Sequence, residues 1–402
     1  MLKQIAKAIL PVPIRQAMRR WCREFMYLLP MQHGKIVFDN FNGKGFGDNP
    51  KYIALEILRQ NLPYDLVWLV SEPHAEIPAS IRQVPINGLR AIYELSTAQV
   101  IINNVKNGLP YKKKSSQFYI QTWHGGGHPT KKIEREIEEL LPIEYIQSSQ
   151  KDSQETDLFL SDGGRSDEWL REAFWYQGKI LHCGLPRNDI YFQANEGDVE
   201  EIKGRLHIAV DCHCLLYAPT FRDAKTYNPY DLDIPAVLAA VTKRFGGKWK
   251  ILVRLHPNDA KNSSLFHYDA NVINASFYSD IQELFLISDA MITDYSSCFV
   301  DMVLFLQRPV FFYTSDLKRY VEESRGLCPE FFTRPFTRDE TNEALVEDIL
   351  TFDEATYRSQ VEQYKAGEKD CSCGDASEQV VEVIKNVMNR SRIGESNEYS
   401  TY

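Results

Sequence analysis

The chain has 402 residues, 44% of them apolar and 25% charged, which suffices for two globular domains and excludes a fibrous or globally disordered protein. Its net charge of -9 disfavours a nucleic-acid-binding protein, because such domains usually carry a basic surplus. The eight cysteines lack zinc-ligand spacing and, without a signal peptide, predict free thiols in a reducing cytoplasm.

Residues 1–30 differ in character from the rest of the chain. They hold six basic residues and only one acidic residue, Glu24. Apolar residues recur at helical spacing from Met18 to Leu29, a pattern typical of a helix that lies in a membrane surface. A helix that packs on a domain through its apolar face is the alternative. Since no apolar run reaches the roughly 20 residues that span a bilayer, we expect a cytoplasmic protein held peripherally on the inner face of the cell membrane.

Residues 31–195 alternate apolar strands with helices, which predicts a parallel α/β domain. The strands are expected at 35–41, 65–71, 99–103, 117–122 and 156–161. The helices are expected at 48–58, 131–141 and 166–176. The segment 184–189 breaks the pattern, so a domain junction is predicted at 190–200.

Residues 196–390 repeat the scheme as a second domain, and residues 391–402 form a polar tail. Strands are expected near 215–218, 249–255, 271–275, 290–293 and 310–313. Helices are expected near 234–244, 279–287, 297–306, 340–365 and 376–389. The predicted fold is therefore α/β, with two doubly wound, Rossmann-like domains that face a central cleft.

Four of the predicted strands end in residues that handle charge. These strand ends lie at 118–125, 216–223, 251–257 and 290–298. Ligands bind outside the carboxyl ends of parallel strands, so the four ends predict one convergent site. At the last of them, Ser296 and Ser297 open a helix whose unpaired amides attract anions. A plain helix cap is the alternative interpretation of these serines.

These segments resemble the CDP-glycerol glycerophosphotransferase family, the teichoic-acid primases and polymerases, whose fold is the two-domain GT-B architecture. The resemblance covers roughly residues 35–390. It rests on QTWHG at 121–125, GLPRND at 184–189, YAPTFRD at 217–223, RLHP at 254–257 and ITDYSS at 292–297. Two departures concern the acceptor side: the loop before Lys131 and Lys132 is longer than is common in the family, and a Pro-Gly-Pro segment is missing after Arg325-Gly326.

The resemblance implies transfer of glycerol phosphate from CDP-glycerol to a hydroxyl of a lipid-linked acceptor, with release of CMP, in teichoic acid or capsule synthesis. Such chemistry requires cations for a diphosphate and a base for the attacking alcohol. His124, in a glycine-rich turn, is predicted to be the general base. His256 is predicted to bind phosphate or to protonate the leaving group, although residue order does not decide which histidine is the base. His128 is a weaker second candidate, and Asp301 is expected to be structural.

Arg222 and Arg254 are predicted to grip phosphate oxygens, with surface ion pairs as the alternative. Asp294 is expected to orient His256, cap an amide or accept from a ribose hydroxyl. The remaining predicted substrate contacts are Gly125, Thr220, Asp223, Ser296, Ser297 and Lys132.

The sequence shows no paired carboxylates at a strand end, so we expect a transferase that needs neither a metal nor another cofactor. The expected partners are CDP-glycerol, a lipid-linked acceptor and an anionic membrane surface, without nucleic acid; a homo-oligomer is left open. The alternatives are a ribitol-phosphate transferase, a GT-B transferase that uses a nucleotide sugar, and a non-catalytic scaffold of envelope assembly. Primase and polymerase activity are not distinguished.

Overall fold

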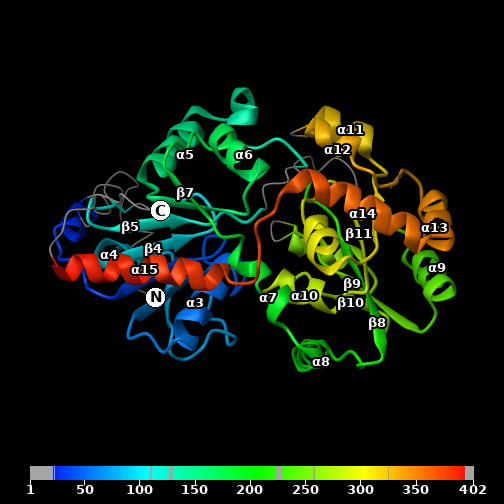
Figure 1. Ribbon diagram of the computed structural model, residues 1–402, viewed down its shortest axis with the longest axis horizontal. Helices are drawn as coiled ribbons and strands as arrows, with labels where there is room; N and C mark the ends of the chain where they lie inside the picture. The colour runs from blue at the N-terminus through cyan, green and yellow to red at the C-terminus, as the bar shows by residue number, and fades with distance from the viewer. Residues whose placement is uncertain are drawn as a thin grey trace, which may run out of the picture.

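The computed structural model describes residues 21, 23–108, 111–125, 130–222, 229–256, 259–324 and 326–393. Two lobes lie side by side, each built on a parallel sheet with helices packed around it (Figure 1). This arrangement confirms the predicted pair of doubly wound α/β domains. Residues 1–20 of the basic segment and residues 394–402 of the polar tail lie outside the described part of the chain.

The first lobe is built on a seven-stranded sheet in the order β3-β2-β1-β4-β5-β6-β7. Its strands are β1 (Lys35–Asp39), β2 (Asp65–Val70), β3 (Arg82–Pro85), β4 (Val100–Asn103), β5 (Phe118–Gln121), β6 (Leu158–Ser161) and β7 (Lys179–His182). Ile36 and Phe38 of the interior strand β1 enter one apolar cluster, whereas Val37 enters the cluster on the opposite face. Helices cover both faces of such a parallel sheet, which explains the nearly continuous apolar character of its strands.

The helices of this lobe follow most of the predictions. They are α3 (Asp48–Arg59), α4 (Leu89–Thr97), α5 (Ile143–Glu155) and α6 (Arg165–Ala173), with the short η1 (Glu134–Leu140). The predicted helix at 131–141 is instead this 3-10 segment, interrupted at Ile137, where φ is -127°. The elements η2 (Pro186–Asn188), α7 (Ile190–Gln193) and α8 (Glu196–Arg205) then lead into the second lobe.

The second lobe contains a six-stranded sheet in the order β10-β9-β8-β11-β12-β13. Its strands are β8 (Cys212–Ala218), β9 (Lys248–Val253), β10 (Val272–Asn274), β11 (Ala290–Thr293), β12 (Val310–Tyr313) and β13 (Arg338–Asp339). Its helices are α9 (Ile234–Phe245), η3 (Ala260–Leu265), α10 (Ile281–Ile287), η4 (Asp301–Leu306), α11 (Leu317–Glu323), α12 (Pro329–Thr333), α13 (Asn342–Thr351) and α14 (Glu354–Glu368). The predicted helix at 297–306 contains a π-helical turn, η4, directly behind the serines.

The last helix, α15 (Ala376–Ile393), belongs to the first lobe rather than to the second. Its buried residues Val380 and Ile384 share an apolar cluster with Ile36 and Phe38 of β1, and Figure 1 shows the helix beside α3. This corrects the predicted second domain of 196–390. The first sheet needs an apolar cover on this face, and the amphipathic 376–393 segment supplies it.

The two lobes meet in buried polar contacts. The ammonium group of Lys51 on α3 lies 2.7 Å from a carboxylate oxygen of Asp280 and 2.7 Å from one of Glu283. Backbone approaches the other lobe closely at Gly47, where an added Cβ would lie 2.8 Å from the carbonyl oxygen of Ser279. A buried ammonium between two carboxylates is costly to break, so these contacts fix how the lobes face each other.

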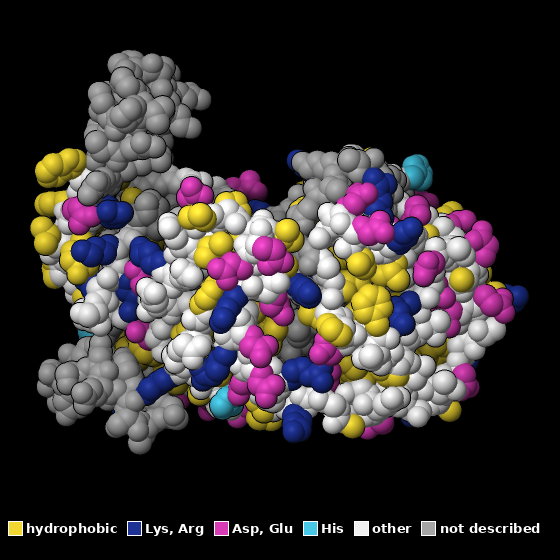
Figure 2. Space-filling model, turned by 90° about the horizontal axis from the view of Figure 1, so that it is seen from above, with side chains coloured by type: hydrophobic (Ala, Val, Ile, Leu, Met, Phe, Trp, Pro, Cys, Tyr) yellow, Lys and Arg dark blue, Asp and Glu magenta, His cyan; other side chains and the backbone are white. Residues whose placement is uncertain are grey.

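The described end of the basic segment exposes large apolar side chains. Trp21, Phe25 and Leu28 are 77%, 66% and 79% exposed, whereas Met26 packs against the first lobe. Within the described residues, no helix combines the length and apolar character needed to cross a bilayer. On the described part of the face in Figure 2, acidic and basic side chains are interspersed over both lobes.

Candidate functional site

The predicted site residues follow the carboxyl ends of strands in both sheets. Gly125, after β5 of the first lobe, lies close to Ser297, after β11 of the second, because a Cβ added to Gly125 would be 3.9 Å from the Ser297 hydroxyl oxygen. Nearby, the Thr130 hydroxyl donates a hydrogen bond to the Tyr295 carbonyl oxygen. The structure therefore brings these strand ends together across the lobe boundary, as expected for a doubly wound fold.

The His124 ring is held by a backbone carbonyl and by aromatic neighbours. Its Nδ1 atom lies 2.6 Å from the Asn104 carbonyl oxygen, which only accepts, so Nδ1 carries the hydrogen and Nε2 is the basic nitrogen. The ring centroid lies 5.0 Å from that of Phe41 and 4.2 Å from that of Trp123. Burial lowers the pKa of His124 below its ordinary value. The imidazole is therefore neutral and oriented, as a general base requires.

The backbone before His124 is held in an unusual conformation. Trp123 has a φ of 51°, which is rare for a bulky side chain and costs on the order of 1–3 kcal/mol. The Asn49 side chain supports this turn, because its Nδ2 atom donates to the Trp123 carbonyl oxygen at 3.1 Å. The strain is localised where the chain aims His124, which is typical of functional sites.

Arg187 fixes the same turn, and sequence reasoning gave it no role although it belongs to the GLPRND segment. Its Nη1 atom donates to the His124 carbonyl oxygen at 2.7 Å and to Asp48 at 3.3 Å. Its Nη2 atom lies 3.8 Å from a carboxylate oxygen of Asp301, which also accepts from Tyr191. Asp301 therefore has the structural role that was expected.

His256 is positioned after β9 in a region of positive charge. The residue is accessible to solvent, and its ring centroid lies 5.6 Å from that of Phe221. Desolvation by the surrounding protein lowers the pKa of His256 well below its ordinary value. Electrostatic repulsion from Lys131, His124 and Arg254 lowers it further. Lys131, His124 and Arg254 therefore lie in the neighbourhood of His256, so the two histidines come from opposite lobes to one region.

Lys131, which precedes the predicted Lys132, lies near enough to both histidines to affect their pKa values. The charge of Lys131 lowers the pKa of both His124 and His256. Lys131 also forms a β-bridge with Leu327 of the second lobe. Lys132 is exposed, and its backbone amide lies 3.4 Å from the Gly326 carbonyl oxygen. The charge of Lys131 thus reaches both histidines, whereas the substrate contact of Lys132 stays a prediction.

Arg254 is a half-buried cation without an acidic partner among the described residues. Its Nη1 atom donates to the carbonyl oxygens of Ala275 at 3.1 Å and Ser276 at 2.6 Å. Burial lowers the pKa of Arg254 to about 10. A guanidinium that is desolvated but not neutralised favours an anionic ligand, so its contacts suit the predicted grip on phosphate.

Arg222 does not match its predicted role in phosphate binding, because its N–H groups already donate hydrogen bonds within the second lobe. Its Nη2 atom donates to Asp294 at 2.8 Å and its Nε atom to Asp316 at 2.8 Å. Its guanidinium also lies over the rings of Tyr295 and Tyr320, 5.0 and 4.9 Å from their centroids. The group is buried and neutralised by two carboxylates, so we correct its predicted role from phosphate binding to structural support.

Asp294 and Thr220 are also structural in this arrangement. One carboxylate oxygen of Asp294 accepts from the Thr220 amide at 2.8 Å, the Thr220 hydroxyl at 2.5 Å and the Tyr295 amide at 2.6 Å. Of the three roles considered for Asp294, only the amide cap is observed. The predicted substrate contacts of these two residues are corrected, because buried hydrogen bonds already occupy them.

The two serines have different surroundings. The Ser296 hydroxyl accepts from the Cys298 amide at 3.2 Å, which is the capping alternative. Ser297 is half-buried and points its hydroxyl toward Gly125 of the other lobe. Asp223 and His128, which were also predicted, lie outside the described residues.

The described part of the chain contains no group of three or more His, Cys, Asp or Glu side chains arranged to hold a metal ion. Arg222 and the buried carboxylates neutralise one another instead of presenting a cluster of oxygens. That transfer needs no metal stays a prediction.

Comparison with known proteins identifies relatives along almost the whole chain. The sequence profile described as CDP-Glycerol:Poly(glycerophosphate) glycerophosphotransferase matches residues 22–386. A teichoic acid poly(glycerol phosphate) polymerase of Bacillus subtilis (strain 168) is 31% identical over 371 residues, which are 89% of this chain and 49% of that protein. A polymerase of the same name from Bacillus spizizenii is 30% identical over 379 residues, 89% of this chain and 93% of that protein. This chain thus spans about half the length of the first relative and nearly all of the second.

Among solved structures, the wall teichoic acid polymerase TagF has a TM-score of 0.83 and 28% sequence identity, covering 98% of this chain and 99% of that chain. A variant of TagF has also been solved after a soak with CDPG. The likeness extends over both lobes and confirms the expected GT-B-like fold.

Proposed function

Because this chain belongs to the CDP-glycerol:poly(glycerophosphate) glycerophosphotransferase family, we propose that it transfers glycerol phosphate from CDP-glycerol to an acceptor hydroxyl in teichoic acid biosynthesis. The observation that carries the proposal is that His124 and His256, from opposite lobes, lie near Arg254, whose guanidinium donates to backbone carbonyl oxygens and forms no ion pair with a described carboxylate. TagF, of which one variant was solved after a soak with CDPG, has the same two-lobed fold.

In this proposal the acceptor oxygen attacks the phosphorus that carries glycerol. A new phosphorus–oxygen bond forms, the bond from this phosphorus to the bridging oxygen breaks, and CMP leaves. His124 accepts the proton of the attacking hydroxyl at Nε2, because Nδ1 is engaged with Asn104. Its lowered pKa keeps it unprotonated at neutral pH. General-base catalysis of this kind contributes roughly 10²–10⁴-fold to a rate.

The donor diphosphate would lie against the second lobe. Arg254 supplies a positive charge there, and the Ser297 hydroxyl lies at the same lobe boundary. His256 is neutral in the free protein, so it donates one N–H to a phosphate oxygen more readily than it transfers a proton to the leaving CMP. Of the two roles predicted for His256, phosphate binding is the one we propose.

Three substrate classes separate this function from its alternatives. The purified chain is incubated with CDP-glycerol, CDP-ribitol or a UDP-sugar in the presence of a short glycerol phosphate acceptor, and nucleotide release is measured. CMP release from CDP-glycerol supports the proposal. Preference for CDP-ribitol indicates a ribitol-phosphate transferase, release of UDP indicates a sugar transferase, and no release from any donor favours a non-catalytic scaffold.

Membrane association is a second part of the proposal. The apolar side chains of Trp21, Phe25 and Leu28 are exposed at the described end of a basic segment, as a peripheral contact with an anionic leaflet requires. A lipid-linked acceptor would then be delivered at that surface. Sedimentation with anionic vesicles should be lost when residues 1–30 are removed, and undiminished sedimentation would contradict this part.

A further inference from the structure

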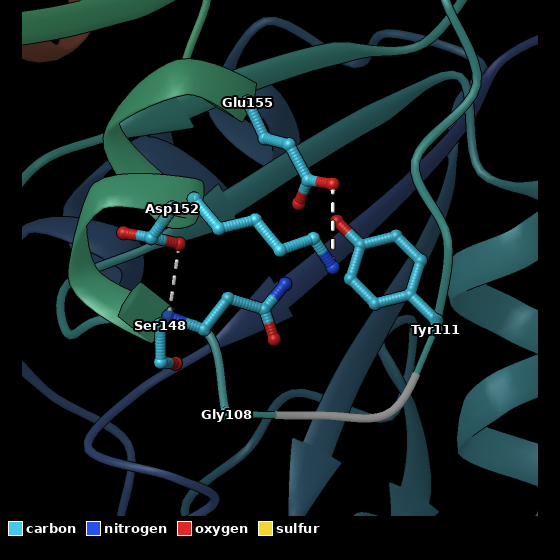
Figure 3. Close-up of a pocket in the computed structure, with 7 residues that line it drawn as sticks. Gly108, Tyr111, Ser148, Asp152 and Glu155 are labelled. Carbon is cyan, nitrogen blue, oxygen red and sulfur yellow. Dashed lines mark hydrogen bonds and ion pairs between the residues drawn. The ribbon is translucent and has the colours of Figure 1, made fainter. Parts of the chain in front are cut away.

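The first lobe contains a polar pocket that the proposed chemistry does not use. The pocket has a volume of about 110 Å³, well above the roughly 10–15 Å³ that one water requires. It lies between α5 and the loop that follows β4, and Figure 3 shows Tyr111 entering it from the loop opposite the helix. The carboxyl end of a parallel strand is where ligands bind in such folds, so the position suits a ligand.

One face of α5 forms a wall of the pocket. Ser148, Lys151, Asp152 and Glu155 all line it, and their spacing of three and four residues places them on one side of the helix. A polar stripe of this kind is by itself a solvated helix face. The tyrosine opposite makes it a candidate site.

Tyr111 is buried with an unsatisfied hydroxyl. The residue is 3% exposed, and no described group forms a hydrogen bond with its oxygen. The Asn107 side chain lies close enough to this hydroxyl to lower its pKa slightly, and it also lines the pocket. Burial and the negative charge of Glu155 raise the pKa of Tyr111, so the hydroxyl keeps its proton and remains a donor. A buried donor without an acceptor costs about 1–3 kcal/mol, which a bound ligand would recover.

The other polar groups define the ligand's chemistry. The Asp152 side chain is held in place by hydrogen bonds within the protein, since its carboxylate accepts from the Asn107 amide and the Tyr119 hydroxyl, each at 3.0 Å. Glu155 is half-buried, and Lys151 lies 3.5 Å from its carboxylate. A ligand hydroxyl can accept from Tyr111 and donate to Glu155, while a phosphate is attracted by the exposed Lys151. Two carboxylates disfavour a bare phosphate in the interior, so a polyol that carries phosphate fits best.

The pocket is linked to the proposed base by a short piece of chain. The loop begins at Asn104, whose carbonyl oxygen holds His124, and Asn107 is already part of the pocket. Three residues span at most roughly 11 Å, which limits the separation of these two points. A chain of polyol phosphate units is long enough to bridge it.

We propose that this pocket is an acceptor subsite that holds one internal glycerol phosphate unit while the terminal hydroxyl reaches His124. The inference rests on the proposed function, because it names the acceptor of that same reaction. Glycerol hydroxyls of the internal unit contact Tyr111 and Glu155, and its phosphate lies at Lys151.

Calorimetric titration of the full chain with a glycerol phosphate trimer, without donor, tests the subsite. Tyr111→Phe should weaken trimer binding about 3- to 10-fold, the loss expected for one hydrogen bond. The variant should unfold at the same or a higher temperature, because the deleted hydroxyl has no partner in the free protein. The matched control is Tyr93→Phe, whose hydroxyl accepts from Gln32 on the same lobe, and it should bind the trimer like the wild type.

The proposal would be overturned if Tyr111→Phe bound the trimer with the affinity of the wild type. It would also be overturned if inorganic phosphate displaced the trimer when both were present at equal concentration. Glu155→Ala provides a second variant at a partly exposed position, and it should weaken binding to a similar extent. Because the titration involves no turnover, a chain that binds the trimer but releases no CMP would refute the proposed function and leave the subsite standing.

Discussion

The Nη1 atom of Arg187 donates a 2.7 Å hydrogen bond to the carbonyl oxygen of His124. The same guanidinium contacts Asp48 of α3 and Asp301 of η4, so it joins the proposed base to both lobes. The turn that aims His124 is thereby coupled to lobe packing. Catalytic geometry at His124 should therefore depend on a residue that does not touch substrate.

Arg187→Lys tests this coupling. Lysine keeps the positive charge but cannot reach the His124 carbonyl and both carboxylates with one planar group. We expect kcat to fall about 10- to 100-fold, because small misplacements of a base are costly, with little change in KM for CDP-glycerol. The matched control is Arg171→Lys on α6, whose exposed guanidinium lies 3.3 Å from the Gly178 carbonyl oxygen. A wild-type kcat in Arg187→Lys would refute the positioning role.

Arg222→Ala should lower the stability of the folded protein. The substitution removes the cation from the buried Asp294 and the partly buried Asp316, and breaking a buried ion pair typically costs about 3–5 kcal/mol. The free energy of unfolding, measured by denaturant titration, should fall by this amount. A loss of CDP-glycerol binding without any loss of stability would instead restore the phosphate-binding role predicted from sequence.

Arg254→Ala should lower the efficiency with which the enzyme uses CDP-glycerol. No described carboxylate pairs with Arg254, so its removal leaves no buried anion behind, and stability should fall much less than in Arg222→Ala. A hydrogen bond to a charged group contributes about 1.5–3 kcal/mol, which corresponds to a roughly 10- to 150-fold lower kcat/KM for CDP-glycerol. An unchanged kcat/KM in Arg254→Ala would show that Arg254 does not bind the donor.

The pH dependence should reflect the lowered pKa of His124. A general base must be unprotonated, and a lowered pKa means that protonation occurs only at a pH below the ordinary histidine value of 6.5. The value of kcat/KM should therefore stay level as pH falls through 6.5 and decline only below it. An acidic limb centred at or above 6.5 would show that the titrating group is not this buried imidazole.

Sequence patterns predicted the central strands well because their apolar runs are buried on both faces. The predicted 290–293 and 310–313 coincide with β11 and β12. The edge strands β3 and β7 were missed, since they are short and half-exposed and lack such a run. The return of α15 to the first lobe was missed too, because amphipathic spacing shows that a helix is covered on one face but not by which sheet.

The site was predicted less completely than the fold. Strand-end motifs predicted His124, His256 and Arg254, whose roles stay predictions. The ion pair of Arg222 with Asp316 joins residues 94 positions apart and leaves no local signal. An arginine can bind an anionic ligand only if no carboxylate in the folded chain already balances its charge, and that contact is not visible in the local sequence. Arg187 was overlooked for the same reason, since its contacts come from three distant segments.

The central claim is that His124 and His256, from opposite lobes, act on one diphosphate. Its most direct test is the rate of CMP release from CDP-glycerol by the wild type, His124→Ala, His256→Ala and the double variant, with a glycerol phosphate acceptor. We expect each single variant to lose about 10²- to 10⁴-fold in kcat/KM, and the double variant to lose far less than the product of the two, because residues that act as a unit are not additive. Wild-type release by either single variant would contradict the claim.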